Sequence, residues 1–239
     1  MRTPLQPALV DLLSYLKDIG YTDVYKARSV AASGPLSTGT GERAGERGNG
    51  INQDSPELAS LRTAAEVCTR CRLAQGRQKV VFGAGSPVAE LMLIGEAPGA
   101  EEDKQGLPFV GAAGELLTKI IQAMDMRRDD IYIANILKCR PPGNRDPQPD
   151  EIAACRGFLE RQIELIQPKV IVALGRIAAQ ALLGNDGPLG QMRGQWYSVQ
   201  GVPTMVTYHP AALLRNQGLK RPTWEDMQQV RDRLRQLRV

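Results

Sequence analysis

The chain has 239 residues and a formal net charge of +4, and 42% of its residues are hydrophobic whereas only 5% are aromatic. A chain of this length and composition can bury one substantial core with a small appendage, so we expect a soluble globular protein. No stretch approaches the length needed to span a bilayer, and the first residues lack the apolar region of a signal peptide. The sequence therefore predicts a cytoplasmic protein without a membrane segment.

Leucine and isoleucine recur at helical spacing near the N-terminus, from Leu5 to Ile19. This spacing predicts an amphipathic helix over about residues 4–20, within an N-terminal helical segment 1–26. A helix this short is marginal without a surface to cover, so it either packs onto the core or binds another protein. The sequence leaves both possibilities open.

The stretch from Ser33 to Gly50 is rich in glycine and serine and contains almost no large apolar side chain. Such a segment cannot offset its loss of conformational entropy by burying apolar surface. We therefore expect a flexible linker over residues 27–56, followed by one globular domain over residues 57–239.

The predicted domain alternates strand-like runs with helical patterns. The strand-like runs cover residues 90–95, 131–136, 169–174 and 203–208. The helical patterns cover about residues 111–126, 149–166, 176–183 and 223–237. Strands that alternate with helices predict an α/β protein with a parallel sheet.

Polar or glycine-rich segments follow the ends of all four predicted strands, where open parallel sheets bind their ligands. These segments are Gly95 to Gly99, Asn135, Gly175-Arg176 and His209-Pro210. The first segment continues into acidic residues, which could bind a ligand or simply start a helix. His209 is the only histidine; it could be structural, or its imidazole could stabilise a charge that develops on a substrate.

Four cysteines suggest a metal centre. Cys68 and Cys71 form a Cys-X-X-Cys pair, whereas Cys139 and Cys155 lie separately and far downstream. A reducing cytoplasm disfavours disulfides, and scattered thiolates suit an iron–sulfur cluster better than a zinc ribbon built from two short pairs. Spacing alone leaves a cluster, a zinc site and unrelated buried cysteines open.

The C-terminal segment, residues 215–239, carries more basic than acidic side chains. This excess favours an anionic partner, or it forms the solvated face of a helix.

Three motifs, in the same order along the chain, resemble those of family-4 uracil-DNA glycosylases, the iron–sulfur branch of their superfamily. They are Gly95-Glu-Ala-Pro-Gly-Ala-Glu-Glu-Asp103 with Leu107-Pro-Phe-Val-Gly111, Asn135-Ile-Leu-Lys-Cys-Arg-Pro-Pro142, and His209-Pro-Ala-Ala-Leu-Leu-Arg215. The resemblance spans Cys68 to about Arg215. It implies a three-layer α/β/α fold with a central, mainly parallel four-stranded sheet. It also implies a [4Fe-4S] cluster bound by Cys68, Cys71, Cys139 and Cys155.

The resemblance further implies an enzyme that flips deoxyuridine out of DNA and hydrolyses its N-glycosidic bond, leaving an abasic site. Asn135 would read the uracil edge, because its amide can donate to O4 and accept from N3–H. Phe109 would stack on the base, unless it is an ordinary core aromatic. A neutral His209 would donate to uracil O2 as the bond lengthens.

Other residues of the motifs would complete the site. Glu96 would lie beneath the sugar, Glu102 is a second candidate for organising water, and backbone N–H groups around Glu96 and Ala97 would hold the base. Leu213, Leu214 and Arg215 would act as a wedge and a phosphate contact, with a packed turn as the alternative. No aspartate or asparagine adjoins Glu96, so the sequence does not identify the water-activating residue.

Uracil-containing DNA is the partner that this interpretation requires, with the protein acting as a monomer in the cytoplasm, at the nucleoid. Two rival interpretations keep the cluster. One is a non-catalytic iron–sulfur module that binds nucleic acid beside replication or repair proteins; the intact Glu96, Asn135 and His209 argue against it. The other is an electron carrier, which would need no uracil pocket.

Overall fold

The structure is a computed structural model that describes residues 54–238. The predicted N-terminal segment 1–26 and all but the end of the predicted linker lie outside these residues. The first helix of the described residues, α2 (Pro56–Glu66), starts next to the predicted boundary between linker and domain. The Ser55 side chain accepts a hydrogen bond of 3.2 Å from the Leu58 N–H and so caps this helix.

A six-stranded sheet lies at the centre, with the strand order β1-β3-β2-β4-β6-β5. The four predicted strands are confirmed as its parallel core: β2 (Leu91–Gly95), β3 (Tyr132–Asn135), β4 (Val170–Leu174) and β6 (Val202–Thr207). All residues of β2, β3 and β4 are buried, as expected for strands covered on both faces.

The expected number of four strands is wrong, because an antiparallel strand is added at each edge of the sheet. These strands are β1 (Ala84–Gly85), which pairs with β3, and β5 (Trp196–Val199), which pairs with β6. β1 has only two residues, and β5 lies partly exposed, so neither has the continuous apolar run that marked the central strands.

Two predicted helices are confirmed with the bounds that the sequence indicated, α5 (Pro149–Ile166) and α6 (Arg176–Leu183). Two others differ at their ends, since α4 covers Ala112–Ala123 and α9 covers Lys220–Gln236. Shorter elements are α3 (Ala100–Gln105), α7 (Leu189–Met192), α8 (Pro210–Arg215), η1 (Arg72–Gln75), η2 (Arg128–Asp130), η3 (Pro142–Asn144) and η4 (Gln217–Leu219). No helix within residues 54–238 is long and apolar enough to cross a bilayer.

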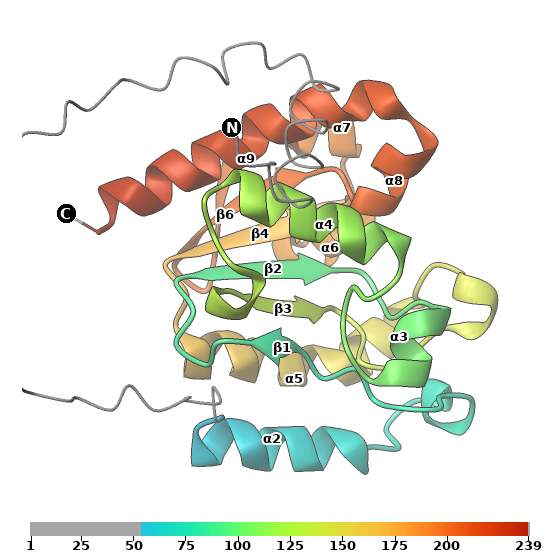
Figure 1. The fold of residues 1–239 in the computed structure, drawn as a ribbon. Coiled ribbons are helices and arrows are strands. Elements are labelled where there is room, and N and C mark those ends of the chain that lie inside the picture. The colour runs from blue at the N-terminus through green and yellow to red at the C-terminus, as the bar shows by residue number, and fades with distance from the viewer. Residues whose placement is uncertain (1–53, 239) are drawn as a thin grey trace, which may run out of the picture.

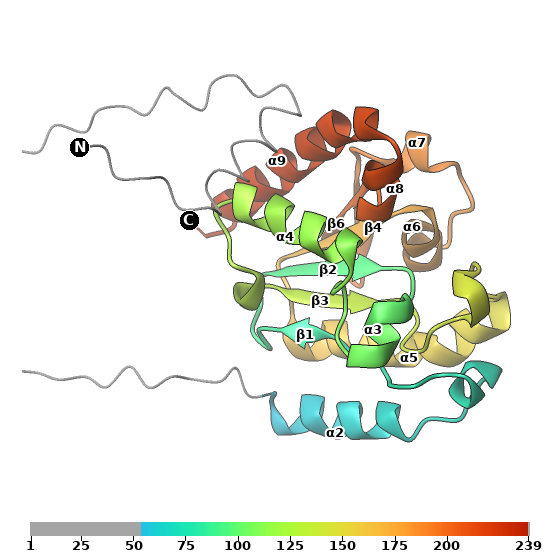
Figure 2. The ribbon, with the colours of Figure 1, turned by 45° about the vertical axis from the view of Figure 1, so that its right-hand side comes forward.

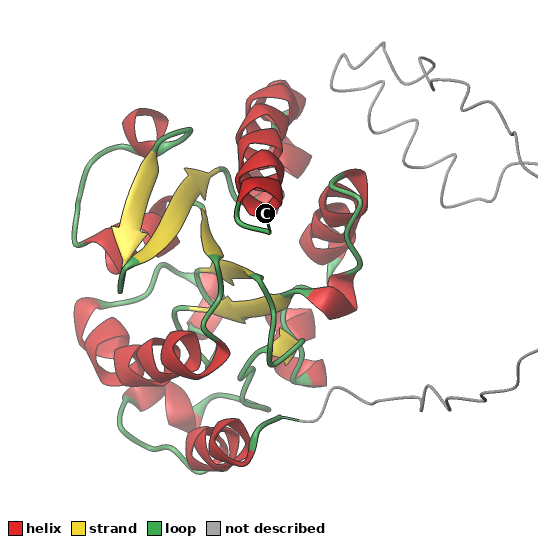
Figure 3. Ribbon diagram, turned by 90° about the vertical axis from the view of Figure 1, so that its left-hand side faces the viewer, coloured by secondary structure: helices red, strands yellow, loops and turns green. Residues whose placement is uncertain are grey.

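The helices cover both faces of the sheet and give the three layers that were expected (Figure 1). α4 and α9 pack on one face, and α5 and α2 lie beyond the other, as the side view also shows (Figure 3). Each face has its own cluster of buried apolar residues. The sheet therefore divides the core into two parts. Because helices cover both faces of the sheet, a ligand site is expected at the carboxyl ends of its strands.

The parallel strands all end at the same side of the molecule, where α3 and α8 follow (Figure 2). The register places Gly95 of β2 opposite Asn135 of β3, and Leu174 of β4 opposite Thr207 of β6. Pairing continues past the strand ends, because the Leu137 N–H donates to the Glu96 carbonyl at 3.0 Å. The motifs that are far apart in sequence thus meet at one edge.

Candidate active site

A cavity of about 600 Å³ opens at the carboxyl edge of the sheet. It brings together most of the site residues that the sequence predicted. Glu96, Ala97, Glu102, Phe109, Asn135, His209 and Arg215 all line it. The three motifs therefore build one site.

Asn135 places an unpaired acceptor in this cavity. The residue is 2% exposed, and its Oδ1 has no hydrogen-bond partner among the described residues. A buried acceptor without a partner costs about 1–3 kcal/mol, so a ligand N–H that reaches it gains a correspondingly favourable contact. Gly95 leaves this acceptor uncovered, because a Cβ at position 95 would lie 2.4 Å from Oδ1.

A buried lysine fixes the backbone of Asn135. Lys138 is 1% exposed, and its Nζ donates to the Asn135 carbonyl at 2.9 Å and to Gln162 Oε1 at 2.6 Å. Gln162 in turn donates to the Phe82 carbonyl at 2.9 Å and to the Tyr132 hydroxyl at 3.1 Å. Burial lowers the pKa of Lys138 to about 8. Sequence analysis did not predict this network, since lysine is almost never fully buried unless it is paired.

Phe109 is buried and lines the cavity, with a left-handed backbone φ of +53°. Its ring stacks on the His209 ring, with centroids 5.4 Å apart and planes inclined by 30°. Phe109 also belongs to the buried apolar cluster on the α4 and α9 face of the sheet, so its ring is both part of the core and part of the cavity wall. Base stacking by Phe109 therefore stays a prediction.

His209 follows β6 and presents a defined tautomer. Its Nδ1 accepts a hydrogen bond of 3.1 Å from the Ala211 N–H, which leaves the ring proton on Nε2. Burial lowers the His209 pKa to about 4; the charge of Arg215 lowers it further, and that of Glu102 opposes the shift. At neutral pH the ring is uncharged and offers Nε2–H as a donor.

Glu96, the first residue after β2, is half-buried. Burial raises its pKa to about 7; the charge of Asp146 adds to the rise, and that of Arg176 opposes it. Asp146 and Arg176 also line the cavity and form an ion pair of 2.8 Å. Sequence analysis predicted Arg176, in the segment Gly175-Arg176, to lie near a ligand site. It did not predict Asp146, which lies in a loop without a recognisable motif.

Glu102 does not have the surroundings of a water-organising group. Its Oε1 accepts from the N–H groups of Val110 at 3.0 Å and Gly111 at 3.1 Å. Its Oε2 accepts from the Gly99 N–H at 3.1 Å. Both oxygens hold backbone of the cavity wall, which favours a positioning role.

The expected DNA contacts of α8 divide between two faces of the helix. Leu213 is fully buried in the same core cluster as residues of α4 and α9, so its expected contact with DNA is not compatible with this structure. Leu214 is 45% exposed, and Arg215 is exposed. Successive residues of a helix point in different directions, so the three cannot share one surface.

The four cysteines all belong to or pack against the same apolar core cluster. Cys139 and Cys155 are buried, Cys68 and Cys71 are half-buried against the same core, and all four are free. The Cys139 Sγ accepts from Arg77 at 3.4 Å, and the Cys155 Sγ accepts from the Lys138 N–H at 3.4 Å. Burial raises the pKa of both of these thiols.

Among the described residues, no three potential ligands converge closely enough to hold a single metal ion. Four free thiols that belong to or pack against one core are the donor type that an iron–sulfur cluster requires, and such a cluster binds them on different iron atoms.

Glu151 connects the cysteines with the cavity wall. Its carboxylate is fully buried and accepts from Arg72, next to Cys71, at 2.9 Å and from Arg145 at 2.6 Å. The Arg145 hydrogen bond holds the Glu151 pKa at about 2, well below its usual value. Because Arg145 lines the cavity, Glu151 links the cavity wall to the segment that carries Cys71.

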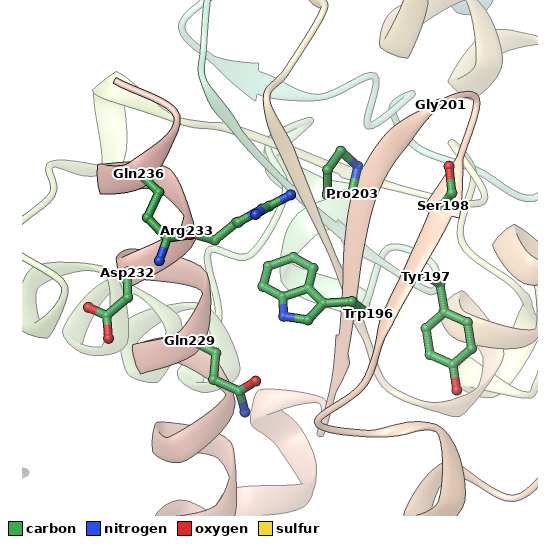
Figure 4. Close-up of a pocket in the computed structure, with 9 residues that line it drawn as sticks. All are labelled: Trp196, Tyr197, Ser198, Gly201, Pro203, Gln229, Asp232, Arg233 and Gln236. Atoms are coloured by element: carbon green, nitrogen blue, oxygen red, sulfur yellow. The ribbon is translucent and has the colours of Figure 1, made fainter. Parts of the chain in front are cut away.

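A second hollow of about 570 Å³ lies between β5 and α9 (Figure 4). Trp196, Pro203, Gln229 and Arg233 are among the side chains that line it. None of the predicted site residues belongs to it. Its lining residues come from the edge strand β5, from the beginning of β6 and from α9, away from the carboxyl ends of the parallel strands.

The fold is α/β, and a cavity lined by buried polar side chains lies at the carboxyl edge of its sheet. The sequence model of the family described as "Uracil DNA glycosylase superfamily" matches residues 82–228, which is more than half of the chain. The chain belongs to this superfamily.

Relatives identify the branch of the superfamily that this chain resembles. The chain is 45% identical over 184 residues to the Type-4 uracil-DNA glycosylase of Sulfurisphaera tokodaii, covering 73% of this chain and 84% of the relative. It is 44% identical to that of Saccharolobus solfataricus, covering 70% and 82%. It is 45% identical to that of Thermotoga maritima, covering 69% and 88%. The resemblance that the motifs indicated is confirmed.

Proposed function

We propose that this protein is a uracil-DNA glycosylase that flips deoxyuridine out of DNA, hydrolyses the N-glycosidic bond and leaves an abasic site for base excision repair. The observation that carries the proposal is the buried, unpartnered Asn135 Oδ1, which lines one cavity with Phe109 and a neutral His209. Type-4 relatives carry the same activity in their names.

Base recognition follows from the Asn135 amide. Its Oδ1 can accept from uracil N3–H, while its NH₂ group can donate to O4. Cytosine reverses this pattern, because it has an acceptor at N3 and an amino group at C4. Phe109 adds stacking attraction that does not depend on base identity, so Asn135 supplies the selectivity.

Bond cleavage leaves negative charge on uracil and positive charge on the sugar. The His209 Nε2–H donates to uracil O2 and stabilises that negative charge in a desolvated site, helped by backbone N–H groups around Glu96 and Ala97. Glu96, in its carboxylate form, lies beneath the sugar, where it stabilises the cation or positions water. Its pKa near 7 leaves a substantial carboxylate fraction at neutral pH.

DNA is held around the cavity by α8. Leu214, which is exposed, enters the gap that the flipped base leaves, and Arg215 contacts a phosphate. Leu213 supports both from the core. Uracil-containing DNA is thus the proposed partner, with the protein acting as a monomer in the cytoplasm at the nucleoid. Residues 1–26 would either pack onto the domain or bind another protein.

Cys68, Cys71, Cys139 and Cys155 would hold a [4Fe-4S] cluster. The bound cluster would supply a rigid cross-link rather than electrons, because hydrolysis of a glycosidic bond requires no net electron transfer. Cys139 lies two to seven residues before four residues of the cavity wall, Pro141, Asn144, Arg145 and Asp146. These residues would therefore be braced by the cross-link.

The test is to incubate the purified protein with a DNA oligonucleotide that contains one uracil and to quantify free uracil over time. Matched oligonucleotides carry thymine or cytosine at that position. Catalytic release from the uracil strand alone, strongly reduced in Asn135→Ala, is the expected result. DNA binding without release, from a protein that retains its iron, would instead establish the non-catalytic module.

A further inference from the structure

Phe109 holds a backbone conformation that its own chemistry disfavours. Its φ of +53° lies in the left-handed region, where a residue with a Cβ is strained unless its surroundings impose the conformation. The loop also lies directly against α4, because a Cβ at Gly114 would come within 1.8 Å of the Phe109 carbonyl oxygen. Something must hold this loop in place.

One side of the loop is held by a negative charge. Glu102 Oε1 accepts from the N–H groups of the two residues after Phe109, Val110 at 3.0 Å and Gly111 at 3.1 Å. The other oxygen of the same carboxylate accepts from the Gly99 N–H at 3.1 Å. Gly99 lies in the loop after β2, so Glu102 ties the Phe109 loop to the loop that carries Glu96.

The other side of the loop is held by a positive charge. Arg128 NH2 donates to the carbonyl oxygens of Pro108 at 2.6 Å and Phe109 at 3.0 Å. Its NH1 donates to Thr118 Oγ1 of α4 at 3.2 Å, which fixes the guanidinium to the helix beneath. Charge-assisted hydrogen bonds of this kind are stronger than neutral ones.

The two charges bind the Phe109–Val110 peptide group from opposite ends, because the guanidinium donates to the Phe109 carbonyl and the carboxylate accepts from the Val110 N–H. The guanidinium also binds the preceding carbonyl, of Pro108, and the carboxylate binds the following N–H, of Gly111. We propose that Glu102 and Arg128 act together as positioning residues that hold the Phe109 ring where it stacks on the flipped base, and that Glu102 does not activate water. This inference rests on the proposed uracil-DNA glycosylase function.

A kinetic cycle separates positioning from water activation. Phe109→Ala should lower kcat/KM for the uracil oligonucleotide about tenfold, the scale of one lost base–aromatic stack. Glu102→Gln and Arg128→Met should each cause a loss of similar or smaller size. When either is combined with Phe109→Ala, the double variant should be no slower than Phe109→Ala alone, because the ring to be positioned is gone. The pH profile of Glu102→Gln should keep the wild-type midpoint.

Two neighbouring residues provide matched controls. Glu101→Gln removes a carboxylate that pairs at the surface with Lys104, and Arg127→Met removes a surface arginine that is paired with Asp129 and Asp130. Both variants should release uracil at the wild-type rate. They show that loss of charge near the loop is not itself the cause of any effect.

A second measurement does not depend on activity. The chain contains three phenylalanines, Phe82, Phe109 and Phe158, so protein labelled with fluorophenylalanine should give three ¹⁹F resonances. Phe109→Leu assigns the Phe109 signal. Glu102→Gln and Arg128→Met should shift or broaden that signal, because the ring leaves its stack on His209, while the other two resonances remain unchanged and report an intact fold.

The outcomes are distinct. Losses that multiply when Glu102→Gln is combined with Phe109→Ala, together with an unperturbed Phe109 resonance, would overturn the proposal and restore Glu102 as a group acting on water. An inactive wild type would refute the glycosylase function, yet the ¹⁹F spectra would still decide whether the two charges hold the ring. Arg128→Lys, which keeps the charge, replaces Arg128→Met if the latter disturbs Phe82 and Phe158.

Discussion

The cavity at the carboxyl edge and the hollow between β5 and α9 have almost the same volume, about 600 and about 570 Å³. Their chemistry differs. The first contains a glutamate and a histidine whose pKa values burial has moved, to about 7 and about 4, and a buried amide oxygen without a partner. The second is lined by Asp232, which is 57% exposed, and by neutral or surface side chains.

This difference shows that volume does not mark a functional site in this molecule. Shifted pKa values cluster at functional sites, although buried ion pairs such as Asp226 with Arg193 shift them as well. The edge cavity concentrates groups with shifted pKa values, whereas among the described residues the hollow between β5 and α9 contains no buried polar side-chain atom without a partner. The two regions can therefore be separated by mutation.

Removal of a cysteine should cause the largest effect on the edge cavity. Cys139→Ala should abolish iron binding and most soluble yield, because metal binding and folding are coupled in a site built from distant segments. Iron content and the visible absorption of the purified protein measure the loss. Iron binding that is unchanged in this variant would show that the proposed ligand set is wrong.

His209→Ala should leave iron and fold intact but lower kcat for uracil release about 10²–10³-fold, the usual cost of removing one donor to a developing negative charge. Single-turnover assays at saturating DNA isolate this step from binding. A rate within a fewfold of wild type would mean that the Nε2–H does not face the leaving group.

The pH dependence should follow Glu96. If the carboxylate is the active form, uracil release rises with pH through a midpoint near 7, while His209, with a pKa of about 4, stays neutral throughout. Asp146→Asn removes a charge that raises the Glu96 pKa, so the midpoint should move to lower pH. Arg176→Met removes a charge that lowers it, so the midpoint should move to higher pH.

These opposite shifts are measured as kcat/KM against pH for the three proteins. They also separate an electrostatic role from a contact with DNA, which would change rates without moving the midpoint. Equal midpoints in all three proteins would assign the titration to a group other than Glu96.

The sequence located the main chemical groups because they follow strand ends within recognisable motifs. Asn135 and His209 lie where predicted, and the parallel core of the sheet was correct. What the sequence missed depends on tertiary contacts. Arg128 and Lys138 look like surface residues in sequence, and only the folded chain shows that one holds the Phe109 loop and the other the backbone of Asn135.

The errors have the same origin. Leu213 and Leu214 are indistinguishable by residue type, and the phase of α8 decides which of them is exposed. Glu102 stands beside other acidic residues in α3, and only the folded chain shows the three N–H groups that it binds. The edge strands β1 and β5 were missed because pairing, rather than an apolar run, defines them.

The smallest expected effect is the sharpest test of the comparison between the two regions. Trp196 is 38% exposed and lines the hollow between β5 and α9 (Figure 4). Trp196→Ala should change uracil release by less than about twofold, since surface substitutions remote from a site usually cost little. Steady-state assays beside His209→Ala make the contrast direct. A large loss of activity in Trp196→Ala, with the fold and iron content intact, would show that the hollow takes part in catalysis although it lacks desolvated groups. The presence of buried groups with shifted pKa values would then no longer distinguish the two regions.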